Sequence, residues 1–187
     1  MLKLKLAKTF PKADAEETKK TSFYFSNGRY MKAAIVHGFK QQVILDSVEK
    51  MNESNLHKLF VELNSTAKES KAACIIIRAY AMFFAFNHNC GFSLFSKEGK
   101  LKFQTPNNQV FGTFSGRQSY EAYITTGVLP VEKGDTVVLY NGNFDQIVQS
   151  PNFYKLICSK DFEKKIDALV EQNKERKEQG VLIFTLN

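Results

Sequence analysis

Three side chains that can bind a transition metal lie in two short stretches of the sequence: His37, His88 and Cys90. Imidazole nitrogens and thiolate sulfurs are ligands that zinc prefers, so a zinc site is one interpretation if folding brings the two stretches together. Their spacing is not that of a zinc ribbon or finger. His88 could instead serve as the base for a nucleophilic Cys90, but residues this close on a strand face in offset directions. Both patterns favour ordinary or buried side chains over a reactive site.

A second candidate is the glycine-spaced segment Gly112-Thr-Phe-Ser-Gly-Arg117. An arginine can bind phosphate through two parallel hydrogen bonds, so Arg117 is a candidate for contact with a phosphopeptide. The segment lacks the Gly-Lys-Ser/Thr ending of a nucleotide-binding loop. Connectors of this composition are common, and we interpret the segment as a loop while phosphopeptide binding by Arg117 stays open.

The elements that position these candidates follow from the spacing of apolar residues. Alternation over residues 2–6 predicts a strand at a sheet edge, and a Ser26-Asn27-Gly28 turn predicts a hairpin of residues 23–25 and 31–36. Steps of three and four residues predict helices over residues 39–63, with residues 52–55 as an optional break, and over 160–177. The other predicted strands are two within residues 72–88, a hairpin of 91–95 and 100–103, and single strands at 122–126, 136–140 and 181–186.

This order of elements is an α+β pattern, because strands and helices do not alternate regularly. It predicts a sandwich built on β-sheet and covered by helices. The length of 187 residues favours one domain spanning residues 1–187. With 17 Phe and no Trp, the core should be rich in phenylalanine.

Composition indicates which kinds of ligand and which cellular location to expect. The formal charge of +7 comes from scattered lysines, which predicts a solvated basic surface more than a nucleic-acid site. Stacking of bases on the aromatics at 23–25 and 83–86 is the nucleic-acid alternative, but these residues fall in apolar strands. The 3 Cys show no disulfide or Cys-x-x-Cys spacing, so we expect a reducing, cytoplasmic location. No run of 18 apolar residues occurs, and we expect no membrane span.

The segment from Val128 through Gly134-Asp135 to Tyr140 resembles a passage of the metal-dependent (type 2C) serine/threonine protein phosphatases and their sporulation stage-II-E relatives. Phe95-Ser-Lys-Glu-Gly-Lys-Leu101 is similar to a charged turn of the same family. The resemblance extends in weaker form from about Ala33 to Leu186. It implies two packed antiparallel sheets with outer helices. It also implies hydrolysis of phosphoserine or phosphothreonine by a water that bridges two Mg²⁺ or Mn²⁺ ions.

The aspartates that such ions require are missing from the matching positions. The Asp-Gly of the first family signature corresponds to His37-Gly38, the acid of the second to Gly142, and the acidic pair of the third to Gln179-Gly180. Asp145 and Glu178 lie within a few residues and could substitute as ligands. Asp135 matches the family, but its place in a tight turn predicts a structural role.

The sequence therefore predicts a pseudophosphatase: a chain with no catalytic residues, no metal and no cofactor that binds a protein as a scaffold or regulator of phospho-signalling. Candidate ligand or partner contacts are His37, Arg117, Asn141, Asn143 and Asp145. Two alternatives stay open. One is an active, divergent phosphatase that uses Asp145, Glu178 or His37 as replacement ligands, and the other is a basic nucleic-acid-binding protein.

Overall fold

The computed structural model describes residues 1–10, 20–38, 41–66, 71–87, 90–105, 124–141, 144–150, 152–172 and 179–187, and the structural statements below concern these residues. Arg117, His88, Gly142, Asn143 and Glu178 lie outside the described residues. Asp145 and Gln179 have a described backbone only.

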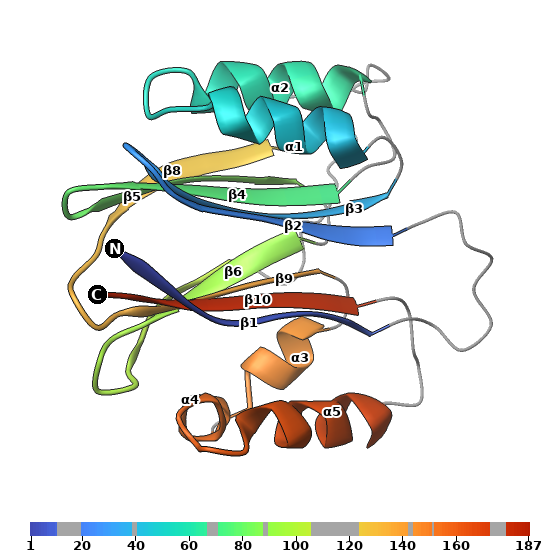
Figure 1. The fold of residues 1–187 in the computed structure, drawn as a ribbon, viewed down its shortest axis with the longest axis vertical. Helices are drawn as coiled ribbons and strands as arrows, with labels where there is room; N and C mark the ends of the chain where they lie inside the picture. Colours follow the sequence, from blue (N-terminus) through green and yellow to red (C-terminus); the bar gives the residue numbers. More distant parts are fainter. Residues whose placement is uncertain are drawn as a thin grey trace, which may run out of the picture.

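Within the described ranges the strands form two five-stranded antiparallel sheets that pack face to face (Figure 1). Sheet A has the order β1 (Leu2–Phe10), β10 (Gln179–Leu186), β9 (Thr136–Asn141), β6 (Cys90–Phe95) and β7 (Leu101–Gln104). Sheet B has the order β2 (Lys20–Asn27), β3 (Met31–Gly38), β4 (Lys71–Arg78), β5 (Ala81–Asn87) and β8 (Ile124–Pro130).

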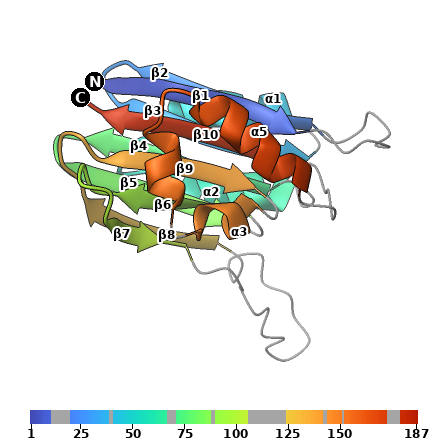
Figure 2. The ribbon, with the colours of Figure 1, turned by 90° about the horizontal axis from the view of Figure 1, so that it is seen from below.

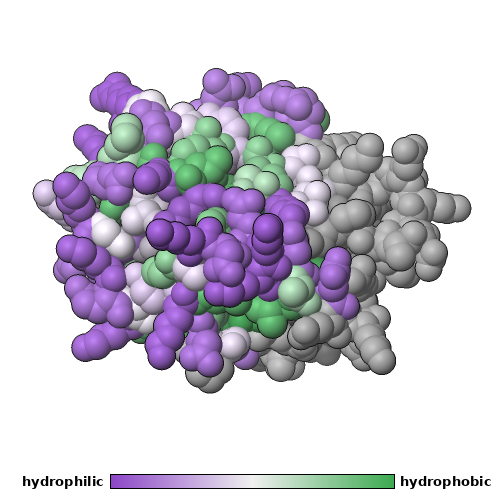
Figure 3. Space-filling view, turned by 60° about the horizontal axis from the view of Figure 1, so that its bottom comes forward, coloured by the Kyte–Doolittle hydropathy of each residue, from purple (hydrophilic) through white to green (hydrophobic). Residues whose placement is uncertain are grey.

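Helices cover the outer face of each sheet, and this confirms the predicted fold class (Figure 1). Helices α1 (Gln41–Lys50) and α2 (Leu56–Thr66) lie on sheet B. Helices α3 (Phe144–Val148), α4 (Phe153–Ile157) and α5 (Phe162–Gln172) lie on sheet A. None of the helices within the described ranges combines the length and apolar character needed to cross a membrane. The face that bears α4 and α5 is mostly hydrophilic, with small hydrophobic areas (Figure 3).

Phenylalanine rings fill the space between the sheets, as the composition predicts. The rings of Phe84 and Phe92 lie 5.0 Å apart, and those of Phe92 and Phe103 lie 5.1 Å apart. Such pairs contribute about 0.5–1.5 kcal/mol beyond the burial of their surface. Phe84 and Phe86 belong to this inner core, and Phe23 and Phe25 pack against it. Phe84 and Phe86 are therefore buried and not available to stack on bases.

The predicted break in the first helical region is confirmed at residues 52–55. The Asn55 side-chain oxygen accepts a hydrogen bond from the Asn52 main-chain N–H at 2.7 Å, and the Asn52 side-chain oxygen accepts one from the Ser54 N–H at 2.9 Å. These bonds offer the backbone an alternative to continued helix. Lys32 lies under the end of α1 and donates from Nζ to the main-chain oxygens of Val48 and Glu49.

Several boundaries differ from the predicted ones. Strand β8 extends to Pro130, beyond the predicted end at residue 126, and α5 begins at Phe162, two residues after the predicted start at residue 160. Helices α3 and α4 were not predicted, because five-residue helices are too short to show a helical period. Each is fixed by a buried aromatic: Phe144 is 0% and Phe153 1% exposed.

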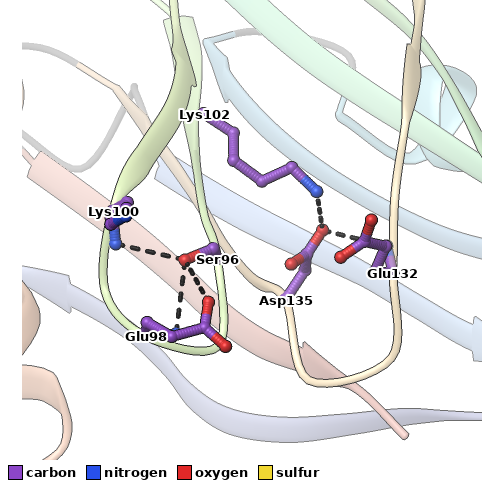
Figure 4. A network of polar contacts seen from close by, with 6 residues as sticks. All are labelled: Ser96, Glu98, Lys100, Lys102, Glu132 and Asp135. Atoms are coloured by element: carbon purple, nitrogen blue, oxygen red, sulfur yellow. Dashed lines mark hydrogen bonds and ion pairs between the residues drawn. The ribbon is translucent and has the colours of Figure 1, made fainter.

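The turns at the end of the sheets that carries both termini are held by side chains (Figure 4). Asp135 is buried, and its carboxylate accepts hydrogen bonds from the Glu132 N–H at 2.9 Å and from Lys102 Nζ at 2.8 Å. Its predicted structural role in the turn is confirmed. In the β6–β7 hairpin Ser96 Oγ accepts from the Lys100 N–H at 3.2 Å, and Gly99 has a positive φ of 85°, which glycine adopts without strain.

Candidate functional site

The strand ends opposite the chain termini bring together residues from both sheets. The antiparallel register pairs Thr21 of β2 with His37 of β3 in sheet B, and Gly180 of β10 with Asn141 of β9 in sheet A. Because the sheets pack face to face, these two pairs lie at the same end of the molecule, on the right in Figure 1. The structure thus gathers three residues that the sequence singled out separately: His37, Asn141 and Gly180.

A chain of hydrogen bonds joins the two sheets at this end. Asn141 Nδ2 donates to Thr21 Oγ1 at 3.1 Å, and Thr21 Oγ1 is 3.1 Å from His37 Nδ1. Asn141 Oδ1 accepts a hydrogen bond from the Gly180 main-chain N–H. Asn141 therefore uses both ends of its amide, one within sheet A and one across to sheet B. We refer to Thr21, His37, Asn141 and Gly180 as the inter-sheet bridge.

The bridge depends on a close approach at Gly180. A Cβ atom at this position would lie 2.6 Å from Thr21 Cγ2 and 3.3 Å from Ile35 Cδ1. Thr21 is 9% and Asn141 1% exposed, so the bonds between the sheets are shielded from water. Hydrogen bonds in such surroundings are strong, and an unpaired group there is costly.

The burial of Asn141 corrects its predicted role. It cannot contact a partner directly, because its side chain lies inside the sandwich and holds Thr21 and Gly180. His37, the last residue but one of β3, is partly exposed. Asp145 follows β9 closely in the chain and belongs to the first turn of α3.

Zinc binding and thiol nucleophilicity at Cys90 do not fit its surroundings. Cys90 is buried in the inner core beside the rings of the sheets, and this burial raises the pKa of its thiol to about 12. A neutral thiol is a weak nucleophile and a weak metal ligand. Across the described part of the chain, no group of three His, Cys, Asp or Glu side chains is placed to hold a metal ion.

The described side chains at this end do not fit a pair of magnesium or manganese ions. Hard divalent cations prefer several carboxylate oxygens. The inter-sheet bridge offers an imidazole, a hydroxyl and an amide, and the amide oxygen already accepts the Gly180 N–H. These groups bind each other and stabilise the end of the sandwich. Replacement by Asp145 or Glu178 stays a hypothesis.

Thr21 is the member of the inter-sheet bridge that the sequence did not single out. Threonine in a strand is common, and nothing in its immediate neighbours sets it apart. The turn at residues 28–30 could have identified it, because counting back along the two strands of the hairpin places Thr21 opposite His37.

The fold can now be compared with solved structures. RsbX in complex with magnesium matches with a TM-score of 0.68 and 13% identity over 100% of both chains. The photosystem II phosphatase PBCP matches with a TM-score of 0.70 and 10% identity, over 100% of this chain and 99% of the other. The Mycobacterium tuberculosis serine/threonine phosphatase PstP matches with a TM-score of 0.64 and 12% identity, again over 100% and 99%. A further match at 12% identity belongs to a structure of the bacterial stressosome.

No protein-family model matches the sequence, and no curated protein is similar to it. The structural neighbours are nevertheless serine/threonine phosphatases of the metal-dependent type, and the chain shares their fold over its whole length. This confirms the family likeness at the level of the fold. One prediction was wrong. The sequence predicted that the chain is not an enzyme, but the solved structures that share its fold include serine/threonine phosphatases, so the fold is that of an enzyme class.

Proposed function

We propose that this protein acts in phospho-signalling by binding a phosphorylated segment of a partner protein at the end of the sandwich where the inter-sheet bridge lies. The observation that carries the proposal is the bridge itself. At this end the two sheets are joined by the hydrogen-bonding side chains of Thr21, His37 and Asn141, none of which is a carboxylate, with hydrogen bonds of 3.1 Å between them.

Charge supports a phosphorylated ligand. A phosphoserine or phosphothreonine carries a charge of about −1.5 to −2 at neutral pH. A cluster of carboxylates without metal would repel it, whereas the side chains of the inter-sheet bridge include no carboxylate. The formal net charge of the chain, +7, adds a long-range attraction.

We assign the contacts as follows. Arg117 would bind the phosphate group through two parallel hydrogen bonds. His37 and Asn143 would bind the phosphate or the peptide, and Asp145 would accept hydrogen bonds from the peptide main chain. Asn141 would position this surface from beneath, because it is buried and holds Thr21.

The wider setting agrees with this role. One structural neighbour comes from the bacterial stressosome, and several others are serine/threonine phosphatases, which supports a role in phospho-signalling for this chain. We further propose that the chain works as one domain over residues 1–187, without a bound metal, in the cytoplasm. The free thiols of Cys74, Cys90 and Cys158 support a reducing compartment.

A peptide-binding experiment tests the proposal. The protein is titrated, in the presence of a chelator, with a library of phosphoserine and phosphothreonine peptides and with the same peptides unphosphorylated. We expect saturable binding that needs the phosphate group. Equal binding of both forms, or binding that disappears when the chelator is added, would contradict it.

A second candidate is metal-dependent hydrolysis of phosphoserine or phosphothreonine. It is favoured by the phosphatases among the structural neighbours and by the place of Asp145, just after β9. Here Asp145, Glu178 and His37 would be the replacement ligands. Release of phosphate from p-nitrophenyl phosphate or a phosphopeptide that needs manganese, stops with chelator and is lost in Asp145→Asn would support it. Phosphate release at the rate of a protein-free control at every manganese concentration would exclude it.

A further inference from the structure

The two sheets have four edge strands, and three of them are protected against pairing with another chain. Strand β1 carries Lys3, Lys5 and Lys8 and has a register irregularity between Leu4 and Leu6. Strand β7 has four residues, one of them a lysine. Strand β2 is tied to β1, because the Asn27 side chain both accepts from the Leu2 N–H at 2.7 Å and donates to the Leu2 carbonyl at 2.9 Å. Charge, shortness and bulges are the usual protections of sheet edges.

Strand β8 lacks these protections. It has seven residues, Ile-Thr-Thr-Gly-Val-Leu-Pro, with no charged side chain, and its register with β5 is regular throughout. Val128 is 57% exposed. In the part of the chain that the structure describes, no strand pairs with its outer side, and in Figure 2 it forms the margin of the molecule next to β7.

The direction of the main-chain groups of β8 follows from its pairing with β5. Val131 N–H donates to the Tyr80 carbonyl at 2.9 Å, and the register of the two strands continues from this pair. In an antiparallel ladder the hydrogen-bonded pairs alternate. Leu129 and Gly127 therefore bond to β5, while Val128 and Thr126 direct their N–H and C=O groups outward. Pro130, which has no N–H, falls at an outward position, as expected for an edge strand.

We propose that two copies of this chain associate through antiparallel pairing of their β8 strands, which continues sheet B across a two-fold axis. With Gly127 at the axis, Thr126 of each copy lies opposite Val128 of the other, and each such pair exchanges two main-chain hydrogen bonds.

The distribution of charge favours a second copy as the occupant. A two-fold axis brings like residues close to each other, so lysines on an edge would repel their own counterparts. The chain has a formal charge of +7, and β8 is the one described edge strand without lysine. This inference does not depend on the proposed function.

Sedimentation equilibrium over a range of protein concentrations tests the dimer, with Val128→Pro as the main variant. This change removes only an outward N–H, so it should leave the β5–β8 ladder intact while weakening association by about tenfold or more. Val128→Lys should have a similar effect through repulsion across the axis. Leu101→Lys is the matched control: Leu101 is 52% exposed on the other sheet's edge, and its change should leave the dimer unaffected.

The dependence of dimerisation on salt concentration is an independent test, because salt screens the repulsion between two positively charged copies and should strengthen this dimer. Thermal melts of each variant show whether it is folded. A monomer at all concentrations and salt levels overturns the proposal. So does a dimer that persists unchanged in folded Val128→Pro and Val128→Lys, or one that Leu101→Lys disrupts equally.

Discussion

The inter-sheet bridge should make Asn141 one of the most stabilising polar residues of the molecule. Replacing it by alanine removes the donor to Thr21 Oγ1 and the acceptor of the Gly180 N–H, both in buried surroundings. A buried group left without a partner costs about 1–3 kcal/mol. The Gly180 N–H loses its side-chain acceptor, and Thr21 keeps its contact with His37. We therefore expect Asn141→Ala to lower the free energy of unfolding by about 2–4 kcal/mol.

Urea denaturation followed by circular dichroism measures this loss directly, and a thermal melt gives a second value. For a chain of this length, 1 kcal/mol corresponds to about 2–4 °C in Tm. The expected fall in Tm is thus about 4–16 °C. The slope of the urea transition should not change, because the same surface is exposed on unfolding.

A double-mutant cycle separates the contact between sheets from general damage. Thr21→Val removes the hydroxyl that joins Asn141 to His37. The double variant Thr21→Val/Asn141→Ala should lose about 1 kcal/mol less unfolding free energy than the losses of the two single variants added together. Asn87→Ala is the matched control, since Asn87 is 3% exposed but its oxygen accepts the Ala72 N–H within sheet B. Strict additivity of Asn141→Ala with Thr21→Val, or a loss below 1 kcal/mol for Asn141→Ala, would refute the bridge.

Three further predictions follow from the packing. Gly180→Ala should lower the unfolding free energy by about 1–3 kcal/mol in urea, because the new Cβ would meet Thr21 at 2.6 Å; a neutral result would mean that the sheets separate easily there. Gly99→Ala should also lower the unfolding free energy by about 1–3 kcal/mol, since Gly99 has a φ of +85° and a Cβ would lie 2.2 Å from the Tyr154 ring. An unchanged melting curve would contradict the packing of this turn on α4. Lys32→Met should alter the pH dependence of stability, because burial lowers the pKa of Lys32 below 10.5 in the folded protein. The wild-type protein therefore gains stability as the pH rises from this lowered pKa toward 10.5. Urea titrations across that pH range should show that the variant lacks this gain.

The sequence was sufficient for the architecture because each layer has its own apolar pattern. Alternation in residues 2–6 predicted an edge strand, and β1 is the edge of sheet A. The long apolar run after Lys71 predicted two buried strands, and β4 and β5 are nearly buried throughout. A hairpin of residues 91–95 and 100–103 was predicted, and the antiparallel pairing of β6 with β7 confirms it.

The candidate site could be located but not built from the sequence. The likeness to phosphatases pointed to His37 and Gly180, which are far apart in the chain, and folding places both at one end of the sandwich. The hydrogen bonds that join them depend on Thr21 and on the burial of Asn141, and these are properties of two sheets in contact. Helices α3 and α4 were missed for a related reason: their short segments are helical because Phe144 and Phe153 are buried against sheet A.

The central claim, that phosphorylated partners bind at the end of the sandwich marked by the inter-sheet bridge, is tested most directly by a matched pair of histidine variants. His37 lies at this end, whereas His57 is exposed on α2, over the outer face of sheet B. Affinity for a selected phosphopeptide is measured by calorimetry for the wild type, His37→Ala and His57→Ala. We predict that His37→Ala weakens binding by about ten- to a hundredfold while His57→Ala leaves it unchanged. Equal affinity of the folded His37→Ala protein and the wild type would contradict the claim.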